Sequence, residues 1–130
     1  MRGFRPLDRI AEDKPLPADV KNLDLITFFF YYHDTTYMEV NRDKMNKAMF
    51  DALKPGAFLI IADHSAKPGE GTTVGKTTHR IEEKTLIEEV TKAGFKHVGT
   101  LPQVGFKFGR WLDLSFYQLL LETPAHPLDG

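Results

Sequence analysis

The sequence predicts an α/β fold, in which a mostly parallel sheet with flanking helices ends in an antiparallel strand. Two apolar segments rich in β-preferring residues, 23–32 and 57–62, lie on either side of one amphipathic segment, 42–53. Strand, helix and strand within about 40 residues form a βαβ unit, whose crossover is right-handed. Two further apolar segments near the C-terminus supply the remaining strands.

The first two predicted strands are apolar on both faces. Residues 23–32 read Leu-Asp-Leu-Ile-Thr-Phe-Phe-Phe-Tyr-Tyr, and residues 57–62 read Ala-Phe-Leu-Ile-Ile-Ala. Alternation between apolar and polar residues is weak in both. This pattern is typical of central strands of a parallel sheet, which are covered on both sides.

The predicted helix between these strands spans residues 42–53. Its apolar positions follow helical spacing and form one stripe: Met45, Met49, Ala52 and Leu53. Asn41 is a suitable N-cap, and an acidic residue, Asp43, stands in the first turn. Pro55 cannot continue a helix, and Gly56 allows a tight turn, so we expect the helix to end there.

A predicted loop, residues 65–79, contains three glycines and four threonines. It is longer than most connections, and such loops are often functional. We expect it to form a lid over the strand ends. A second amphipathic helix, residues 82–93, follows and ends at Gly94.

The last part of the predicted domain holds two strands, residues 95–101 and 114–122, separated by an irregular loop over 102–110. We expect these strands to form an antiparallel pair with a long connection. Three prolines interrupt residues 1–22, which are expected to form an irregular N-terminal arm. The predicted organisation is thus this arm, one α/β domain over residues 23–124, and a tail over 125–130.

Composition narrows the class of protein. A chain of 130 residues is the size of one domain, and 17 basic against 18 acidic residues leave a net charge of −1. That balance predicts neither nucleic acid nor a membrane as partner. The chain has no cysteine, and its longest apolar run, Leu25–Tyr32, is too short to span a bilayer. We therefore expect a soluble cytoplasmic protein.

Five short motifs occur together with these elements: Tyr32-His33-Asp34, Met45-Asn46-Lys47, Phe50-Asp-Ala-Leu-Lys-Pro-Gly56, Asp63-His64-Ser65-Ala66 and His79-Arg80-Ile81. Together they resemble the C-terminal half of class I S-adenosylmethionine-dependent methyltransferases, and within that family a bacterial subfamily of predicted methyltransferases. The resemblance implies a partial Rossmann-like fold. It makes the four predicted strands the fourth to seventh of that fold, with the seventh inserted between the fifth and sixth.

The resemblance implies S-adenosylmethionine as cofactor, but the chain departs from the family pattern. That pattern includes a glycine-rich turn after the first strand and an acidic residue after the second. Neither precedes residue 23, where the one glycine is Gly3. The resemblance therefore implies a truncated or divergent methyltransferase whose methyl acceptor is unknown. The alternatives are a non-catalytic module that dimerises or docks on a partner, and a gene fragment without independent activity.

Polar residues follow the first two predicted strands at their C-terminal ends. His33 and Asp34 follow one strand, and Asp63 and His64 follow the next. Ligands of parallel sheets bind at this edge, and adjacent strands lie about 5 Å apart. By resemblance these four residues face the methyl-transfer site as catalytic residues, where an imidazole would take a proton from the acceptor. The alternative is that they only cap the backbone of loops.

The resemblance also implies a set of residues that bind a small-molecule substrate: Tyr31, Tyr32, Ser65, His79 and Arg80. For His79 and Arg80 the alternative is ordinary packing at the start of a helix. Three histidines with two carboxylates also suit a metal. Their scattered positions contain no H-x-x-x-H pair, and no metal site is predicted.

Strand 23–32 has no evident partner on its outer side within the preceding residues. A long apolar edge strand favours pairing with another chain. We therefore expect a homodimer, formed through the exposed strand 23–32 or through the aromatic surface beside it.

Overall fold

The computed structural model describes residues 16, 17, 19–107 and 109–118. Their elements in chain order are β1 (Leu23–Phe29), the 3₁₀ helix η1 (His33–Thr36), α1 (Arg42–Ala52), β2 (Leu53–Ala62), α2 (Gly75–Thr78), α3 (Glu83–Lys92), β3 (Lys96–Lys107) and β4 (Arg110–Gln118). This order confirms the predicted α/β class. Most of the predicted N-terminal arm and the whole predicted tail lie outside the described residues.

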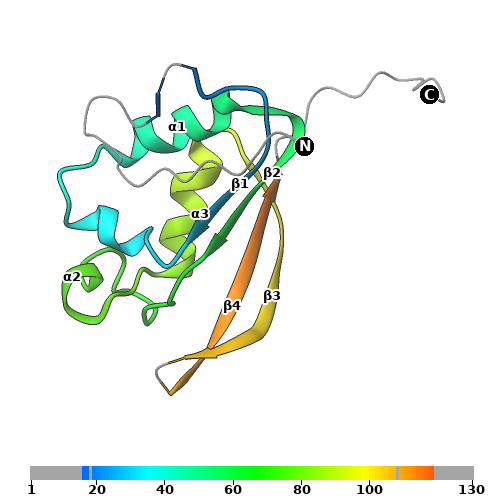
Figure 1. Cartoon of the computed structure of the whole chain (residues 1–130). Helices are drawn as coiled ribbons and strands as arrows, with labels where there is room; N and C mark the ends of the chain where they lie inside the picture. Colours follow the sequence, from blue (N-terminus) through cyan, green and yellow to red (C-terminus); the bar gives the residue numbers. More distant parts are fainter. Residues whose placement is uncertain (1–15, 18, 108, 119–130) are drawn as a thin grey trace.

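The four strands form one sheet in the order β1-β2-β4-β3 (Figure 1). β1 and β2 are parallel, with Leu25 opposite Phe58 and Phe29 opposite Ala62. β4 is antiparallel to both of its neighbours, so the other three strands run in one direction. The prediction of a mostly parallel sheet with an inserted antiparallel last strand is confirmed.

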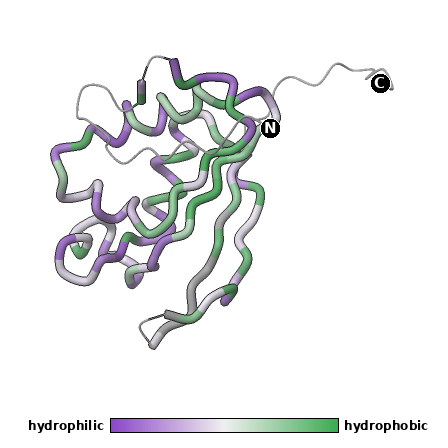
Figure 2. The backbone as a smooth tube through the Cα atoms, viewed as in Figure 1, coloured by the Kyte–Doolittle hydropathy of each residue, from purple (hydrophilic) through white to green (hydrophobic). Residues whose placement is uncertain are grey.

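The core lies between the sheet and two helices. Figure 1 shows α1 and α3 together on one side of the sheet. Met45, Met49 and Ala52 of the predicted stripe are buried there on α1, and so are Leu86 and Val90 of α3. The sheet contributes a buried row that includes Leu59, Ile61 and Tyr117. Figure 2 shows that hydrophobic residues are concentrated along β1 and β2.

The prediction that both apolar strands are covered on both faces is wrong. Burial alternates along β2, where Leu59 and Ile61 are buried and Phe58 is exposed. On β1, Leu25 is 49% exposed and Phe29 is 50% exposed. Within the described part of the chain, helices pack on one face of the sheet, so an apolar residue on the other face has nothing to cover it.

Several predicted boundaries also differ from the structure. β2 begins at Leu53, directly after α1, so Pro55 and Gly56 lie inside this strand and not in a turn before it. β1 ends at Phe29, and Phe30 adopts a positive φ of 54° in the turn that follows. The predicted irregular loop 102–110 is wrong, because β3 continues to Lys107 across a register shift between Leu101 and Gly105. Pro102 lies inside that strand. An edge strand tolerates a proline, because its outward N–H needs no partner strand.

The predicted lid, residues 65–79, contains the short helix α2, which packs against η1. The contact is close: a Cβ at Gly75 would lie 2.1 Å from Oγ1 of Thr36 and 2.8 Å from the carbonyl oxygen of His33. Only glycine permits this approach, because any side chain would collide with η1. Within the described residues, no helix is long and apolar enough to cross a membrane.

Candidate functional site

The C-terminal ends of β1 and β2 bring His33, Asp63 and His64 together. A hydrogen bond from the N–H of Phe30 to the carbonyl of Ala62, 2.7 Å long, holds the two strand ends side by side. His33 then opens η1, and Asp63 directly follows β2. The ring centroids of His33 and His64 lie 6.3 Å apart. Parallel pairing thus produces the convergence that the strand order predicts.

The Asp63 carboxylate is the centre of this arrangement. It accepts hydrogen bonds from the backbone N–H of His33 at 2.8 Å, from Nδ1 of His33 at 2.6 Å and from the backbone N–H of His64 at 2.7 Å. Its side chain is almost fully buried. A buried carboxylate requires such donors, and three of them hold Asp63 and both histidine-bearing segments in place.

Asp34 and His79 extend the cluster toward solvent. Oδ1 of Asp34 lies 3.1 Å from Nε2 of His33 and 3.6 Å from Nδ1 of His79. His79 is the C-cap of α2 and adopts a left-handed conformation, with φ 54° and ψ 54°. The packing of α2 on η1 therefore places His79 beside His33, with 5.4 Å between their ring centroids.

Exposure increases steadily across this cluster. The side chain of His33 is 4% exposed, that of Asp34 22% and that of His79 64%. The cluster therefore has a buried, hydrogen-bonded side at Asp63 and an open side at His79.

Tyr32 lies in the core, away from the position at the site that the resemblance implied. Its hydroxyl donates to Oε2 of Glu89 at 2.9 Å and accepts from Nδ2 of Asn46 at 2.8 Å. Burial, followed by the charge of Glu89, raises the pKa of Tyr32 far above its ordinary value. Arg42 donates two hydrogen bonds to the same carboxylate. This network joins α1 to α3.

The other predicted substrate-binding residues have local contacts. The Tyr31 hydroxyl donates to Sδ of Met38 at 3.4 Å. Nη1 of Arg80 donates to the carbonyl oxygen of Ser65 at 3.0 Å. Arg80 and Ser65 thereby join the two ends of the loop that follows β2.

Two roles were not predicted from the sequence: that of Gly75, which brings α2 against η1, and that of Glu89 in the core. Gly75 carried one usable signal, because it lies in the predicted loop shortly before His79. Glu89 carried none. An acidic residue on an amphipathic helix is normally solvent-exposed, and its pairing with Arg42 depends on how two helices meet.

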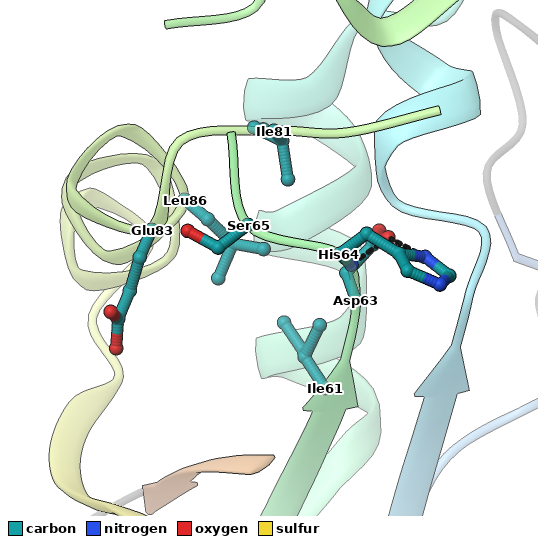
Figure 3. A pocket seen from close by; sticks show the side chains of 7 residues that line it. All are labelled: Ile61, Asp63, His64, Ser65, Ile81, Glu83 and Leu86. Atoms are coloured by element: carbon teal, nitrogen blue, oxygen red, sulfur yellow. Dashed lines mark hydrogen bonds and ion pairs between the residues drawn. The ribbon is translucent and has the colours of Figure 1, made fainter. Parts of the chain in front are cut away.

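A small cavity of about 30 Å³ lies beside the strand ends, lined by Ile61, Asp63, His64, Ser65, Ile81, Glu83 and Leu86 (Figure 3). In Figure 3 the His64 ring points away from Ser65 and Glu83. Such a volume holds one or two waters, whereas small-molecule sites enclose several hundred Å³. A larger open hollow, about 430 Å³, lies between α1 and α3. Four of its charged residues are paired with one another, Arg42 with Glu89 and Lys92 with Asp43.

No protein-family model matches the chain. Among curated proteins, a short segment is similar to acyltransferases. It is 59% identical over 34 residues to an L-methionine sulfoximine/L-methionine sulfone acetyltransferase of Salmonella typhimurium, covering 26% of this chain and 20% of that protein. An L-amino acid N-acyltransferase of Escherichia coli is 56% identical over the same length. The chain thus spans about a fifth of the curated relatives that it matches.

Solved structures of methyltransferases resemble most of the chain. A SAM-dependent methyltransferase of Methanosarcina mazei has a TM-score of 0.60 and 17% identity, covering 82% of this chain and 64% of that one. The N-methyltransferase NodS of Bradyrhizobium japonicum, in complex with S-adenosyl-L-homocysteine, has a TM-score of 0.54 and 19% identity, covering 78% and 48%. A possible histamine N-methyltransferase of Thermotoga maritima has a TM-score of 0.55 and 16% identity, covering 80% and 59%. The described residues of this chain therefore share part of the Rossmann-like fold of these SAM-dependent methyltransferases.

Proposed function

We propose that the chain is part of an S-adenosylmethionine-dependent methyltransferase and forms the acceptor side of its active site. The observation that carries the proposal is the convergence of four polar residues at the C-terminal ends of two parallel strands: His33, Asp34, Asp63 and His64. This edge is where open α/β sheets bind ligands. Because solved methyltransferases share this fold, methyl transfer is the chemistry expected at that edge.

The described residues do not by themselves fit the cofactor. They contain no glycine-rich turn that follows a strand preceding β1 and no acidic residue after a further strand. The cavity beside the strand ends holds only one or two waters. The remaining contacts of S-adenosylmethionine would have to come from residues of this chain outside the described ones or from a second copy of the chain.

The part that these residues play is to bind and orient a polar acceptor. Asp63 holds the His33 ring by its Nδ1, which leaves Nε2 directed toward Asp34 and the open side of the cluster. Imidazole and carboxylate groups at an open edge bind a hydroxyl or amine and accept a proton from it. The acceptor that this chemistry favours is a small molecule with such a group.

A calorimetric titration of the full chain with S-adenosylmethionine and S-adenosylhomocysteine tests the proposal. We expect saturable binding of both, with a dissociation constant below about 1 mM. The absence of binding at that concentration would contradict the methyltransferase function. It would favour the second candidate.

That second candidate is a non-catalytic assembly module, and the exposed apolar face of the sheet favours it. Leu25, Phe29 and Phe58 are exposed on this face, and Leu101 of β3 adds a fourth large apolar side chain. Large exposed apolar patches mark interaction sites. In addition, β1 is at the edge of the sheet and can pair with another strand. We propose a second copy of the chain as the partner.

A further inference from the structure

We propose that His33, Asp34 and His79 bind one divalent transition-metal ion of the zinc class, with Asp63 orienting His33. The site shares His33 and Asp34 with the function proposed above, but metal binding is measured without cofactor or methyl transfer, so the two proposals can fail separately. Its four residues come from three segments that are distant in sequence: the turn after β1, the residue after β2 and the end of α2.

The distances between the donor atoms match a metal site. Each of the three residues offers a ligand atom, and these atoms lie within 4.8 Å of one another. Metal bonds of about 2.0–2.1 Å in tetrahedral arrangement place neighbouring donors about 3.4 Å apart. Oδ1 of Asp34 lies 3.1 Å from Nε2 of His33 and 3.6 Å from Nδ1 of His79. One ion at the centre therefore reaches all three with small side-chain adjustments.

The hydrogen bond between His33 and Asp63 determines which nitrogen is the ligand. A carboxylate only accepts, so Nδ1 of His33 carries the proton that it donates to Asp63 at 2.6 Å. In the neutral ring Nε2 then has a lone pair that faces a carboxylate oxygen of Asp34 at 3.1 Å. Two such lone pairs repel unless a proton or a cation lies between them. A carboxylate on the second nitrogen of a histidine is the usual support of a metal ligand.

A second combination, His33 with Asp63 and His64, also brings three donors within 4.8 Å. It is the weaker candidate, because Nδ1 of His33 and Oδ1 of Asp63 are 2.6 Å apart. That is a hydrogen-bond distance and too short for two donors on one ion. The Asp63 carboxylate already accepts three hydrogen bonds as well. Asp63 therefore acts on the site through His33.

The environment suits an ion that remains accessible. His33 is buried and held on one side, whereas His79 is 64% exposed. An ion with three protein ligands and an open side keeps a coordination position for water or a substrate. Imidazole nitrogens with a carboxylate and no thiolate favour zinc, cobalt or iron over magnesium and calcium. The tight contact of Gly75 with Thr36 keeps the segment that bears His79 in place.

Metal titration of the full chain tests the proposal. The chain is first dialysed against a chelator and then titrated with Co²⁺, whose visible absorption reports tetrahedral coordination, and Zn²⁺ is added in competition. We expect one ion per chain. His79→Ala and Asp34→Asn should each weaken binding by about 100-fold, and Asp63→Asn, which removes the support of His33, by about 10-fold to 100-fold.

A histidine outside the cluster supplies the matched control. His97 on β3 contacts Tyr117 and Thr100, so His97→Gln should leave metal affinity unchanged. Circular dichroism confirms that each variant is folded. The proposal is overturned if no ion binds at about 1 mM, or if His79→Ala binds as tightly as the parent chain. It is also overturned if nitrogen NMR shows both His33 ring nitrogens protonated and unaffected by Zn²⁺.

Discussion

The Asp63 carboxylate holds His33 by two hydrogen bonds, one of 2.8 Å to its backbone N–H and one of 2.6 Å to its ring nitrogen Nδ1. This pair joins the segment after β1 to the residue after β2. It fixes both the position and the tautomer of the histidine at the centre of the candidate site.

Replacing Asp63 with asparagine should destabilise the fold. An amide has one accepting oxygen where the carboxylate has two, and its NH₂ group would face a donor. Because hydrogen bonds to charged groups contribute about 1.5–3 kcal/mol each, we expect Asp63→Asn to lower the free energy of unfolding by about 2–3 kcal/mol. Urea denaturation measures this. Asp51→Asn, which removes an exposed carboxylate on α1, should lower the free energy of unfolding by less than about 1 kcal/mol. Equal losses for the two variants would contradict the role of the Asp63 carboxylate in holding His33.

Gly75→Ala should separate α2 from η1. The added methyl would lie 2.1 Å from Oγ1 of Thr36, so the helix has to move. Overpacking of this kind costs about 1–3 kcal/mol. Thermal unfolding should show the loss, and the histidine ring signals in NMR should shift because His79 moves away from His33. Lys76→Ala, at the neighbouring exposed position, should change neither, and an unperturbed Gly75→Ala would show that the contact is not tight.

Tyr32 should make the stability of the protein fall at high pH. Its pKa is raised in the folded state by burial and by Glu89. Folding thus favours the neutral phenol. The contribution of this phenol to the stability of the fold is complete below about pH 10, the ordinary pKa of tyrosine. It is lost as pH rises further, by up to about 1.4 kcal/mol per pH unit.

Denaturant unfolding between pH 8 and pH 11 checks this effect when Tyr32→Phe is compared with the parent chain. The variant should be less stable at pH 8, because Asn46 and Glu89 lose a hydrogen-bond partner. It should also lose less stability above pH 10. If stability falls with pH in parallel for the variant and the parent chain, Tyr32 ionises equally in the folded and unfolded states, which would contradict the prediction.

Leu25→Lys should abolish self-association through the apolar face of the sheet. We expect the parent chain to be a dimer at micromolar concentration, measured by size-exclusion chromatography with light scattering. A charge at Leu25 would be buried in that interface without a partner, which is strongly unfavourable. Met38→Lys, at an exposed apolar residue outside the sheet, should leave the dimer intact. A parent chain that is purely monomeric would refute both the dimer and the assembly module.

Much of the fold follows from local sequence. The stripe of α1 and its Asn41 cap, whose side chain accepts from the N–H of Lys44 at 3.0 Å, depend only on residues within a few positions of each other. The parallel pairing of the first two strands follows from the helix between them. The bounds of β3 were not predictable in this way. Pro102 is tolerated only because β3 is an edge strand, and the position of a strand in a sheet is not a local property.

The same distinction between local sequence and tertiary contacts applies to the candidate site. The sequence by itself determined that His33 and Asp63 would follow adjacent parallel strands, because chain direction and strand pairing place such residues at one edge. The resemblance implied that both His79 and Tyr32 lie at the site, and only the tertiary structure decided that His79 joins the cluster and that Tyr32 does not. The first depends on the contact between Gly75 and Thr36, and the second on how α1 and α3 meet over the sheet. Contacts between distant segments are selected by shape and by hydrogen-bond satisfaction in three dimensions, for which residue spacing contains no signal.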